Sequence, residues 1–354
     1  MKQKGTKAIA LGAFLFLAAE ASLISIELEP SDPGIAFSAK RDGYPTIFLA
    51  GAIHALPEDH QIPPSIYITI YHLVNRIGFE YDENEGGSSD RVQKSFFPAQ
   101  EKSASALLAP ISLTQLRTFC DQDDLFPFNQ ALFASPLYVH FQVLQTLNSR
   151  SGISPKFGTD TVFRAAAESD SKPLLFLETA SDQISAFEKL GVPYFESRIV
   201  DRVSKNPDSH RAQADHLYSL WRDGDTSGFE SASVAEMSDE FSSHILEDRN
   251  RAWLPKILSQ AKADDSPIVY FVGSAHLVGK QSLIELLERE GFAVTQIRSS
   301  ASLPSPEAPA PRRPASSTGP PQETPTSKAK PTRSSQHDTK KSFPNLFRKF
   351  RSKL

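Results

Sequence analysis

Two stretches that lie far apart along the chain share one pattern of apolar and polar positions. Each is an apolar run rich in β-branched and aromatic residues that breaks at a glycine, and a histidine follows three residues later: TIFLAGAIHAL at 46–56 and IVYFVGSAHLV at 268–278. Such runs predict buried strands. A buried strand that ends in this turn delivers its imidazole to the C-terminal edge of a sheet, where open α/β sheets bind ligands. We therefore expect His54 and His276 to share one site.

The pattern after the first copy predicts a helix and then a second strand. Pro63 and Pro64 are suited to the start of a helix, Gly78 is expected to end it, and 79–81 takes the place of the next strand. The apolar face of this helix is predicted to consist of Ile66, Ile70, Leu73, Val74 and Ile77.

The second copy repeats this plan. The strand at 268–272 precedes a helical segment that Gly291 closes, and 292–297 is the next strand. The helix is lined by Leu283, Leu286 and Leu287. Both copies are β-loop-α-β units, for which parallel pairing with a right-handed crossover is the default. An internal duplication of half-domains is the simplest interpretation.

A third junction between a strand and a helix lies in the middle of the chain. The apolar run 174–177 ends at Glu178, and the segment that follows has a helical pattern. Either Thr179 or Ser181 can cap that helix. Glu178 is thereby placed at the C-terminal edge of a strand.

The remaining segments, 95–170 and 195–262, have the pattern of helices joined by loops. We expect a loop at 152–160, with Asp160 as the N-cap of the helix that follows. The fold class is thus α/β: duplicated β-loop-α-β halves form a mixed, partly parallel sheet flanked by helices.

The N-terminal residues 1–21 resemble an export signal. Lysines at positions 2, 4 and 7 precede the apolar run 8–19, and Ala-Glu-Ala at 19–21 offers a cleavage site. We expect a mature chain that begins near Ser22 and is periplasmic or secreted; the alternative is an uncleaved membrane anchor. The lone Cys120 excludes an intrachain disulfide.

The C-terminal region has a different composition from the rest of the chain. Residues 301–354 carry 11 Lys and Arg against 3 Asp and Glu, or +8, which leaves −12 for the remainder of a chain with net charge −4. The Pro, Ser and Thr-rich stretch 299–339 is predicted to be disordered. In 340–354, cations flank an apolar stripe suited to an anionic membrane surface or an acidic partner; a merely solubilising tail is the alternative. The stripe consists of Phe343, Leu346, Phe347 and Phe350.

The globular domain is therefore expected at 22–298, and it lacks several familiar motifs. It has no Gly-rich phosphate loop, no Cys-x-x-Cys pair and no Gly-x-Ser-x-Gly elbow. These absences argue against nucleotide-binding, zinc-ribbon and serine-hydrolase functions. We expect no nucleic-acid partner.

Four predicted strand ends carry polar groups: His54, Glu80, Glu178 and His276. Imidazoles and carboxylates form a mixed set of nitrogen and oxygen donors, which suits Mn, Co, Fe or Zn with open positions for water. Such an ion supplies hydroxide at neutral pH, and a carboxylate outside the ligand set can act as general base. The alternatives are a solvated acidic loop for Glu80 and helix N-terminal charge compensation for Glu178.

Arg249 is a further candidate, late in a helical stretch before the second repeat. Its guanidinium can hold a substrate carboxylate or stabilise an oxyanion. The alternative is an exposed, charged helix face.

These motifs resemble the TraB/GumN family, which is related to the Tiki proteins and more distantly to the erythromycin-esterase and ChaN-like fold. The resemblance covers 46–297 and rests on seven landmarks in the family's order: GAIH at 51–54, FE at 79–80, GISPKFGTD at 152–160, KPLLFLETASDQ at 172–183, WRDGD at 221–225, RNRAW at 249–253 and GSAHLVG at 273–279.

The resemblance implies a duplicated α/β fold in which the paired Gly-x-x-His motifs, a glutamate and an arginine line one site. It favours His54, Glu80, His276 and Arg249 for that site, with Glu178 next. Tiki-type members are divalent-metal-dependent proteases, so the resemblance also implies this activity.

Two positions depart from the family pattern. Ala52 stands where Ser or Thr is common, and Ser181 stands where an acid is usual. We nevertheless expect an exported, metal-dependent hydrolase that acts on peptide bonds, with His54, His276 and Glu80 as metal ligands. The alternative is a cell-envelope protein that binds a peptide or small ligand without turnover.

Overall fold

The computed structural model describes residues 32–60, 63–82, 89–234 and 237–303. The expected signal segment at 1–21 lies outside the described residues, as do nearly all of the Pro-rich stretch and the whole of the basic C-terminal segment. No helix among the described residues is long and apolar enough to cross a membrane.

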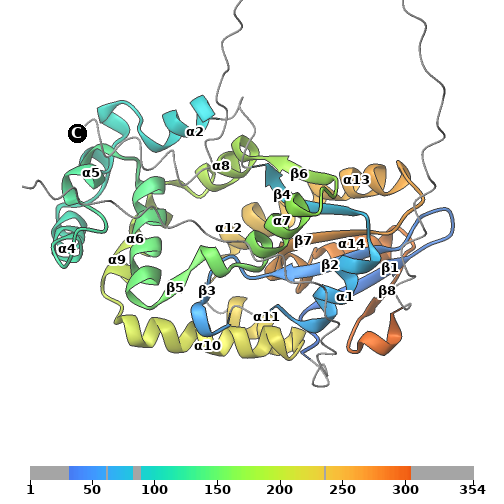
Figure 1. The fold of residues 1–354 in the computed structure, drawn as a ribbon. Helices are drawn as coiled ribbons and strands as arrows, with labels where there is room; N and C mark the ends of the chain where they lie inside the picture. The colour runs from blue at the N-terminus through green and yellow to red at the C-terminus, as the bar shows by residue number, and fades with distance from the viewer. Residues whose placement is uncertain (1–31, 61–62, 83–88, 235–236, 304–354) are drawn as a thin grey trace, which may run out of the picture. The chain divides into compact units, whose positions relative to one another are not determined.

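A six-stranded mixed sheet forms the centre of the fold, with the strand order β6-β4-β7-β2-β1-β8 (Figure 1). Its strands are β1 (Ala36–Lys40), β2 (Ile47–Ala52), β4 (Arg76–Asp82), β6 (Leu174–Thr179), β7 (Ile268–Gly273) and β8 (Ala293–Gln296). The pairs β6-β4, β4-β7 and β7-β2 are parallel, whereas β1 is antiparallel to both of its neighbours. The predicted mixed, partly parallel α/β sheet is confirmed.

The two copies of the repeated pattern lie side by side at the middle of this sheet. Strands β2 and β7 pair in parallel from Ile47 opposite Ile268 to Ala52 opposite Gly273, and every residue of both strands is buried. Because the two strands end in the same register, the turns that follow them leave the sheet at one edge. The pairing thus brings both histidine turns to the same place.

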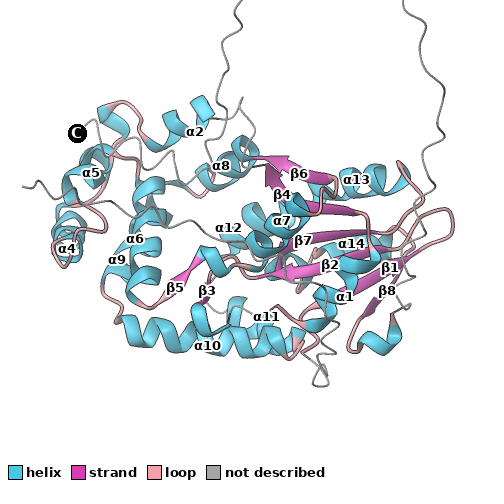
Figure 2. Ribbon diagram, in the orientation of Figure 1, coloured by secondary structure: helices cyan, strands magenta, loops and turns pink. Residues whose placement is uncertain are grey.

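Helices cover both faces of the sheet, as Figure 2 shows. Helices α1 (Ser65–Leu73) and α7 (Thr159–Ser169) lie on one face, where the Phe163 ring stacks on that of Phe271 at 4.3 Å between centroids. Tyr270 precedes Phe271 in β7, so its side chain points to the other face of the sheet. There it donates a hydrogen bond to Gln260 of α13 (Asp248–Lys262). Helix α14 (Leu283–Arg289) and strand β8 follow β7 as predicted.

The helix after the first copy is shorter than the sequence pattern indicates. It ends at Leu73, and both Ile77 and Gly78 belong to β4, so the prediction that Ile77 is helical and Gly78 ends the helix is wrong. The buried start of β4 continues the apolar spacing of the helix and hides the boundary. Gly78 serves a different purpose here, since a Cβ at this position would collide with the ring of Tyr270.

A second, mostly helical part packs around its own apolar core, as expected for the segments 95–170 and 195–262. Its helices are α2 (Ser89–Phe96), α3 (Ala104–Leu107), α4 (Pro110–Cys120), α5 (Phe128–Phe133), α6 (Pro136–Arg150), α8 (Ala180–Glu188), α9 (Gly191–Val203), α12 (Asp239–Phe241) and a π-helical segment (Ser242–Glu247). Helices α10 (Pro207–Arg222) and α11 (Thr226–Val234) instead pack against the core of the sheet through Tyr218, Trp221 and Phe229. The short strands β3 (Leu56–Pro57) and β5 (Ile153–Ser154) pair with each other. This helical part contributes one wall of the site described next.

Candidate functional site at the edge of the sheet

Five of the residues singled out in the sequence meet at the C-terminal edge of the sheet. His54 follows β2, His276 lies in the 3-10 turn Ser274–Leu277 after β7, and Glu80 is the fifth residue of β4. Glu178 lies near the end of β6, and Arg249 is in the first turn of α13. Four neighbouring parallel strands and one helix therefore supply the set.

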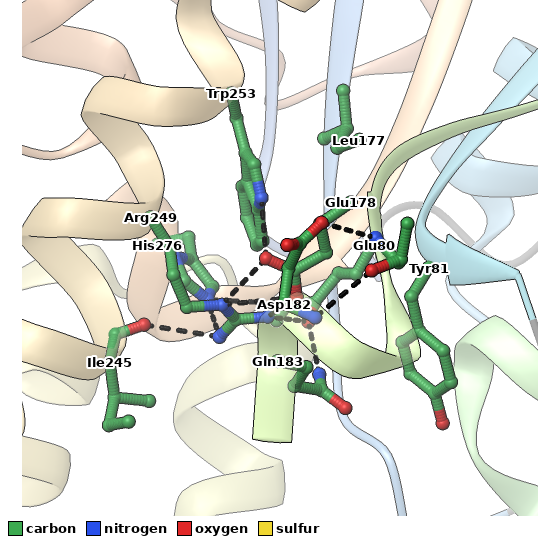
Figure 3. A network of polar contacts seen from close by, with 12 residues as sticks. Glu80, Tyr81, Leu177, Glu178, Asp182, Gln183, Ile245, Arg249, Trp253 and His276 are labelled. Carbon is green, nitrogen blue, oxygen red and sulfur yellow. Dashed lines mark hydrogen bonds and ion pairs between the residues drawn. The ribbon is translucent and has the colours of Figure 1, made fainter. Parts of the chain in front are cut away.

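Arg249 is the centre of the polar network in Figure 3. Its Nη2 donates hydrogen bonds to Glu80 Oε2 at 2.7 Å and to Glu178 Oε1 at 2.6 Å. Its Nη1 donates to the Ile245 carbonyl at 3.1 Å and to His276 Nε2 at 3.2 Å. The side chains of Arg249, Glu80 and Glu178 are only 5–7% exposed, so the three charges compensate one another away from water.

The two imidazoles are oriented in the same way. His54 Nδ1–H donates to Asp160 Oδ2 at 3.1 Å, and His276 Nδ1–H donates to Asn250 Oδ1 at 2.7 Å. Each Nε2 is therefore the nitrogen that faces the site, and each lies 3.8 Å from the same oxygen, Glu80 Oε1. An acceptor behind Nδ1 fixes the tautomer and the plane of the ring, as it does for histidines that bind metal ions.

The two imidazoles differ in their state of protonation. His276 is buried against the Trp253 ring, and this burial together with the adjacent Arg249 cation lowers its pKa to about 3. His54 lines the cavity with 57% of its side chain exposed. Desolvation by the cavity walls opposes its charged form, but the carboxylates of Asp160 and Glu80 outweigh this effect and raise the pKa of His54 to about 9. Near neutral pH, His276 is neutral and His54 is cationic.

The two glutamates are also held differently. Burial acts to raise the pKa of Glu80, but Arg249, His276, His54 and the Gly273 N–H, which donates to Oε1 at 2.7 Å, together hold that pKa far below its usual range. Burial dominates at Glu178 and raises its pKa despite the Arg249 cation. Trp253 Nε1–H donates to Glu178 Oε2 at 2.9 Å.

A cavity of about 530 Å³ opens above this cluster. His54, Glu80, Asp160, Arg249 and His276 line its floor. Glu178 does not line it, since this side chain lies on the far side of the Arg249 guanidinium and borders a separate hollow. The structure thus divides the candidates into four that face the cavity and one that supports them.

The model of the TraB/PrgY/gumN family matches residues 36–296 of the sequence. The chain belongs to this family. No curated protein and no solved structure gave a match. The matched span runs from β1 to β8 and includes all five residues of the cluster.

Two partners of the histidines in this TraB/PrgY/gumN member were not recognised from the sequence. Asp160 was predicted to be the N-cap of α7, but the N-cap is Gly158. Asp160 lies in the first turn of the helix, where its carboxylate accepts the hydrogen bond from His54. A Cβ on Gly158 would collide with the His54 carbonyl, and Thr159 N–H donates to the Ile53 carbonyl at 2.9 Å. The start of α7 is therefore fitted against the His54 turn, which brings Asp160 to the imidazole.

Asn250, the partner of His276, follows Arg249 directly in the sequence. Asp160 lies in the landmark segment GISPKFGTD, and Asn250 lies in RNRAW. Their places in these segments were the signal in the sequence that could have indicated a role in the site. The helix after β6 is capped by Thr179, one of the two expected candidates, in a capping box with Asp182. Ser181 is not the cap.

The donor set agrees in chemistry with a divalent ion, although its spacing is wide. Neighbouring ligand atoms at about 2.0–2.2 Å from one ion lie roughly 2.8–3.6 Å apart in tetrahedral or octahedral geometry, whereas each imidazole Nε2 is 3.8 Å from Glu80 Oε1. Within the described ranges, no group of three or more His, Cys, Asp or Glu side chains has the arrangement of an assembled metal site. To share an ion, each histidine would have to approach Glu80 by a few tenths of an ångström in tetrahedral geometry and by up to about 1 Å in octahedral geometry.

Proposed function

We propose that this protein is a divalent-metal-dependent hydrolase that cleaves peptide bonds, with His54, His276 and Glu80 as the ligands of the ion. The observation that carries the proposal is the pair of imidazole Nε2 atoms, each 3.8 Å from one carboxylate oxygen and each fixed by an acceptor behind Nδ1. Two nitrogens and an oxygen leave positions open for water and substrate, as in catalytic sites for Mn, Co, Fe or Zn.

A bound ion of this kind lowers the pKa of a coordinated water and polarises a carbonyl group. The chain's own residues prepare the site for that chemistry. Asp160 and Asn250 hold the proton on Nδ1 of each histidine, so that Nε2 is the nitrogen left for an ion, which at His54 would have to displace the second proton of the cationic ring. The Gly273 N–H and Arg249 fix the Glu80 carboxylate from two sides.

Arg249 acts here as a positioning residue. Its Nε and both Nη atoms donate hydrogen bonds to Glu80, Glu178, His276 and the Ile245 carbonyl, so it is already engaged within the site. This arrangement favours a role in holding the two carboxylates over the capture of a substrate carboxylate. Glu178 then supports Arg249 from behind and is less suited to act as the general base.

A second candidate function is the binding of a peptide or small ligand without turnover. The Arg249 guanidinium favours it, because it neutralises Glu80 and donates to His276 Nε2, so both groups have partners within the chain. A chain that remains in this state has a shaped polar cavity but no activated water.

Metal titration of the purified protein tests the leading proposal. We expect a stoichiometric divalent ion, or micromolar binding of Mn, Co or Zn by calorimetry, that is lost in the double variant His54→Ala/His276→Ala. The double variant His72→Ala/His216→Ala is a matched control, because both of these histidines are exposed and lie outside the cavity. Equal metal binding by both double variants, or none by the wild type, would refute the metal site.

Turnover is tested separately, by mass spectrometry of a defined peptide mixture after long incubation with metal-loaded protein. New peptide termini that are absent with the double variant of His54 and His276 support hydrolysis. Intact peptides that co-purify with the protein support the binding function instead.

We also propose export of the chain and attachment of its basic C-terminal segment to an anionic surface. Both rest on sequence composition outside the described residues. Identification of the N-terminus of protein recovered from the periplasm or medium tests export. Co-sedimentation with phosphatidylglycerol vesicles, full chain against residues 1–298, tests the surface role; equal sedimentation of the two would refute it.

A further inference from the structure

The cavity above the polar cluster has two chemically different sides. All of its charged residues lie on the floor, at the edge of the sheet. The opposite wall is mainly apolar and comes from helices: it includes Phe141, Phe187, Phe241, Ile245 and Leu246 of the helical part and Phe229 of α11, with Gln183 and Ser233 as its polar members. Polar groups converge at one end of this cavity, and its walls are mainly apolar. Sites that bind small molecules are usually built in this way.

Aromatic rings from three helices form the main part of this wall. Phe141 of α6 and Phe187 of α8 pack edge to face with centroids 5.0 Å apart, and Phe241 of α12 lies 6.4 Å from Phe187. All three rings are only partly buried. Such rings border the cavity instead of filling the core, so apolar surface remains for a ligand to cover.

The charges around the wall restrict what can occupy it. Arg249 is the only lysine or arginine among the described residues that line the cavity, and Glu80, Glu178, His276 and a carbonyl take up its hydrogen bonds. A ligand carboxylate would thus find no free guanidinium or ammonium group here, and the cationic His54 already has the carboxylates of Asp160 at 3.1 Å and Glu80 at 3.8 Å. The wall favours an uncharged apolar group.

We propose that this wall is a specificity subsite that takes a large apolar or aromatic side chain of a peptide, with the adjacent amide bond over His54, Glu80 and His276. The volume of about 530 Å³ lies within the range of pockets that enclose small ligands and accommodates such a side chain together with its flanking amides. The identity of the amide as the scissile bond rests on the proposed function. The preference for an apolar side chain does not.

Equilibrium binding tests the subsite without any need for turnover. N-acetyl-L-phenylalaninamide and N-acetylglycinamide present the same two amides and differ only in the benzyl group. We expect the full chain to bind the phenylalanine compound tighter by about tenfold or more, as measured by ligand-observed NMR titration, because a benzyl group is larger than the single methylenes that change selectivity by 10-fold or more. Equal affinity for the two compounds would overturn the subsite.

Two alanine variants locate the preference. Phe187→Ala removes the central ring of the wall and should reduce the preference several-fold, whereas Phe133→Ala removes a ring that is 62% exposed on α5 and lies outside the cavity. A loss of the same size in both variants would overturn the assignment. Phe241→Ala provides a second variant of the wall if Phe187→Ala lacks the circular dichroism of the folded protein.

The outcomes separate this inference from the proposed function. A phenylalanine preference in a protein that never cleaves peptides supports the subsite and contradicts the hydrolase. Cleavage without preference between peptides with phenylalanine and with glycine at the bond supports the hydrolase and contradicts the subsite.

Discussion

Removal of the Arg249 guanidinium is the sharpest test of the electrostatic arrangement at the sheet edge. The change Arg249→Met keeps an unbranched apolar side chain but leaves the carboxylates of Glu80 and Glu178, which are 7% and 5% exposed, without their shared cation. Loss of one partner from a buried ion pair costs about 3–5 kcal/mol. We expect the free energy of unfolding to fall by about this amount.

Arg251 of the same helix provides a matched control. It is 46% exposed and pairs with Asp248 at 2.6 Å on the surface. Surface ion pairs contribute about 0–1 kcal/mol because water screens them. Arg251→Met should therefore leave the free energy of unfolding nearly unchanged.

Urea unfolding of metal-free protein, followed by far-ultraviolet circular dichroism, measures both variants. The triple variant Arg249→Met/Glu80→Gln/Glu178→Gln should regain much of the loss, because neutral amides cost less to bury than unpaired carboxylates. If Arg249→Met costs no more than Arg251→Met, the site is solvated and our account of the buried cluster is wrong.

The pH dependence gives a second readout of the same change. In the wild type the pKa of Glu80 is held below its unfolded value, so its contribution to stability is present above that value and is lost on acidification below it. Without Arg249, burial should raise the pKa values of Glu80 and Glu178 above their unfolded values. Any loss of stability between pH 7 and 5 should then be smaller in Arg249→Met than in the wild type, so the difference between the two should shrink as the pH falls. A difference that is independent of pH would contradict this reasoning.

Three further predictions concern the groups around the two histidines. The pKa of His276 is about 3 in the folded chain and 6.5 in the unfolded chain, so its contribution to stability is present above pH 6.5 and is lost as the pH falls below it. Acidification from pH 7 to 5 should therefore lower the free energy of unfolding of metal-free protein by about 2 kcal/mol. This loss should be absent in His276→Asn. Asp160→Asn should lower the pKa of His54 from about 9 toward its ordinary value, as read from NMR titration of the imidazole, while Asp215→Asn, outside the cavity, should leave that pKa unchanged. Gly158→Ala should displace the His54 turn and weaken metal binding, and unchanged metal affinity in a folded variant would contradict the close fit of α7.

Local sequence predicted the parts of the fold in which neighbouring residues decide the outcome. The runs before His54 and His276 become β2 and β7, and the helix after the second copy begins and ends close to the expected residues. The capping box of Thr179 is likewise a contact between residues three positions apart. The prediction that Ile77 is helical failed for a physical reason. The buried strand β4 continues the apolar spacing of helix α1, so the sequence pattern does not show where the helix ends. Only the pairing of β4 with β7 in the folded chain makes Ile77 part of a strand.

The sequence by itself also indicated which polar groups lie at strand ends, because each of them ends or directly follows an apolar run. It did not determine what each group does there. The tertiary structure placed Arg249 between Glu80 and Glu178, moved Glu178 behind the cavity and brought Asp160 and Asn250 to the imidazoles. Burial, pKa and hydrogen-bond partners depend on segments 26 to 169 residues apart, and only the packed chain brings those segments together.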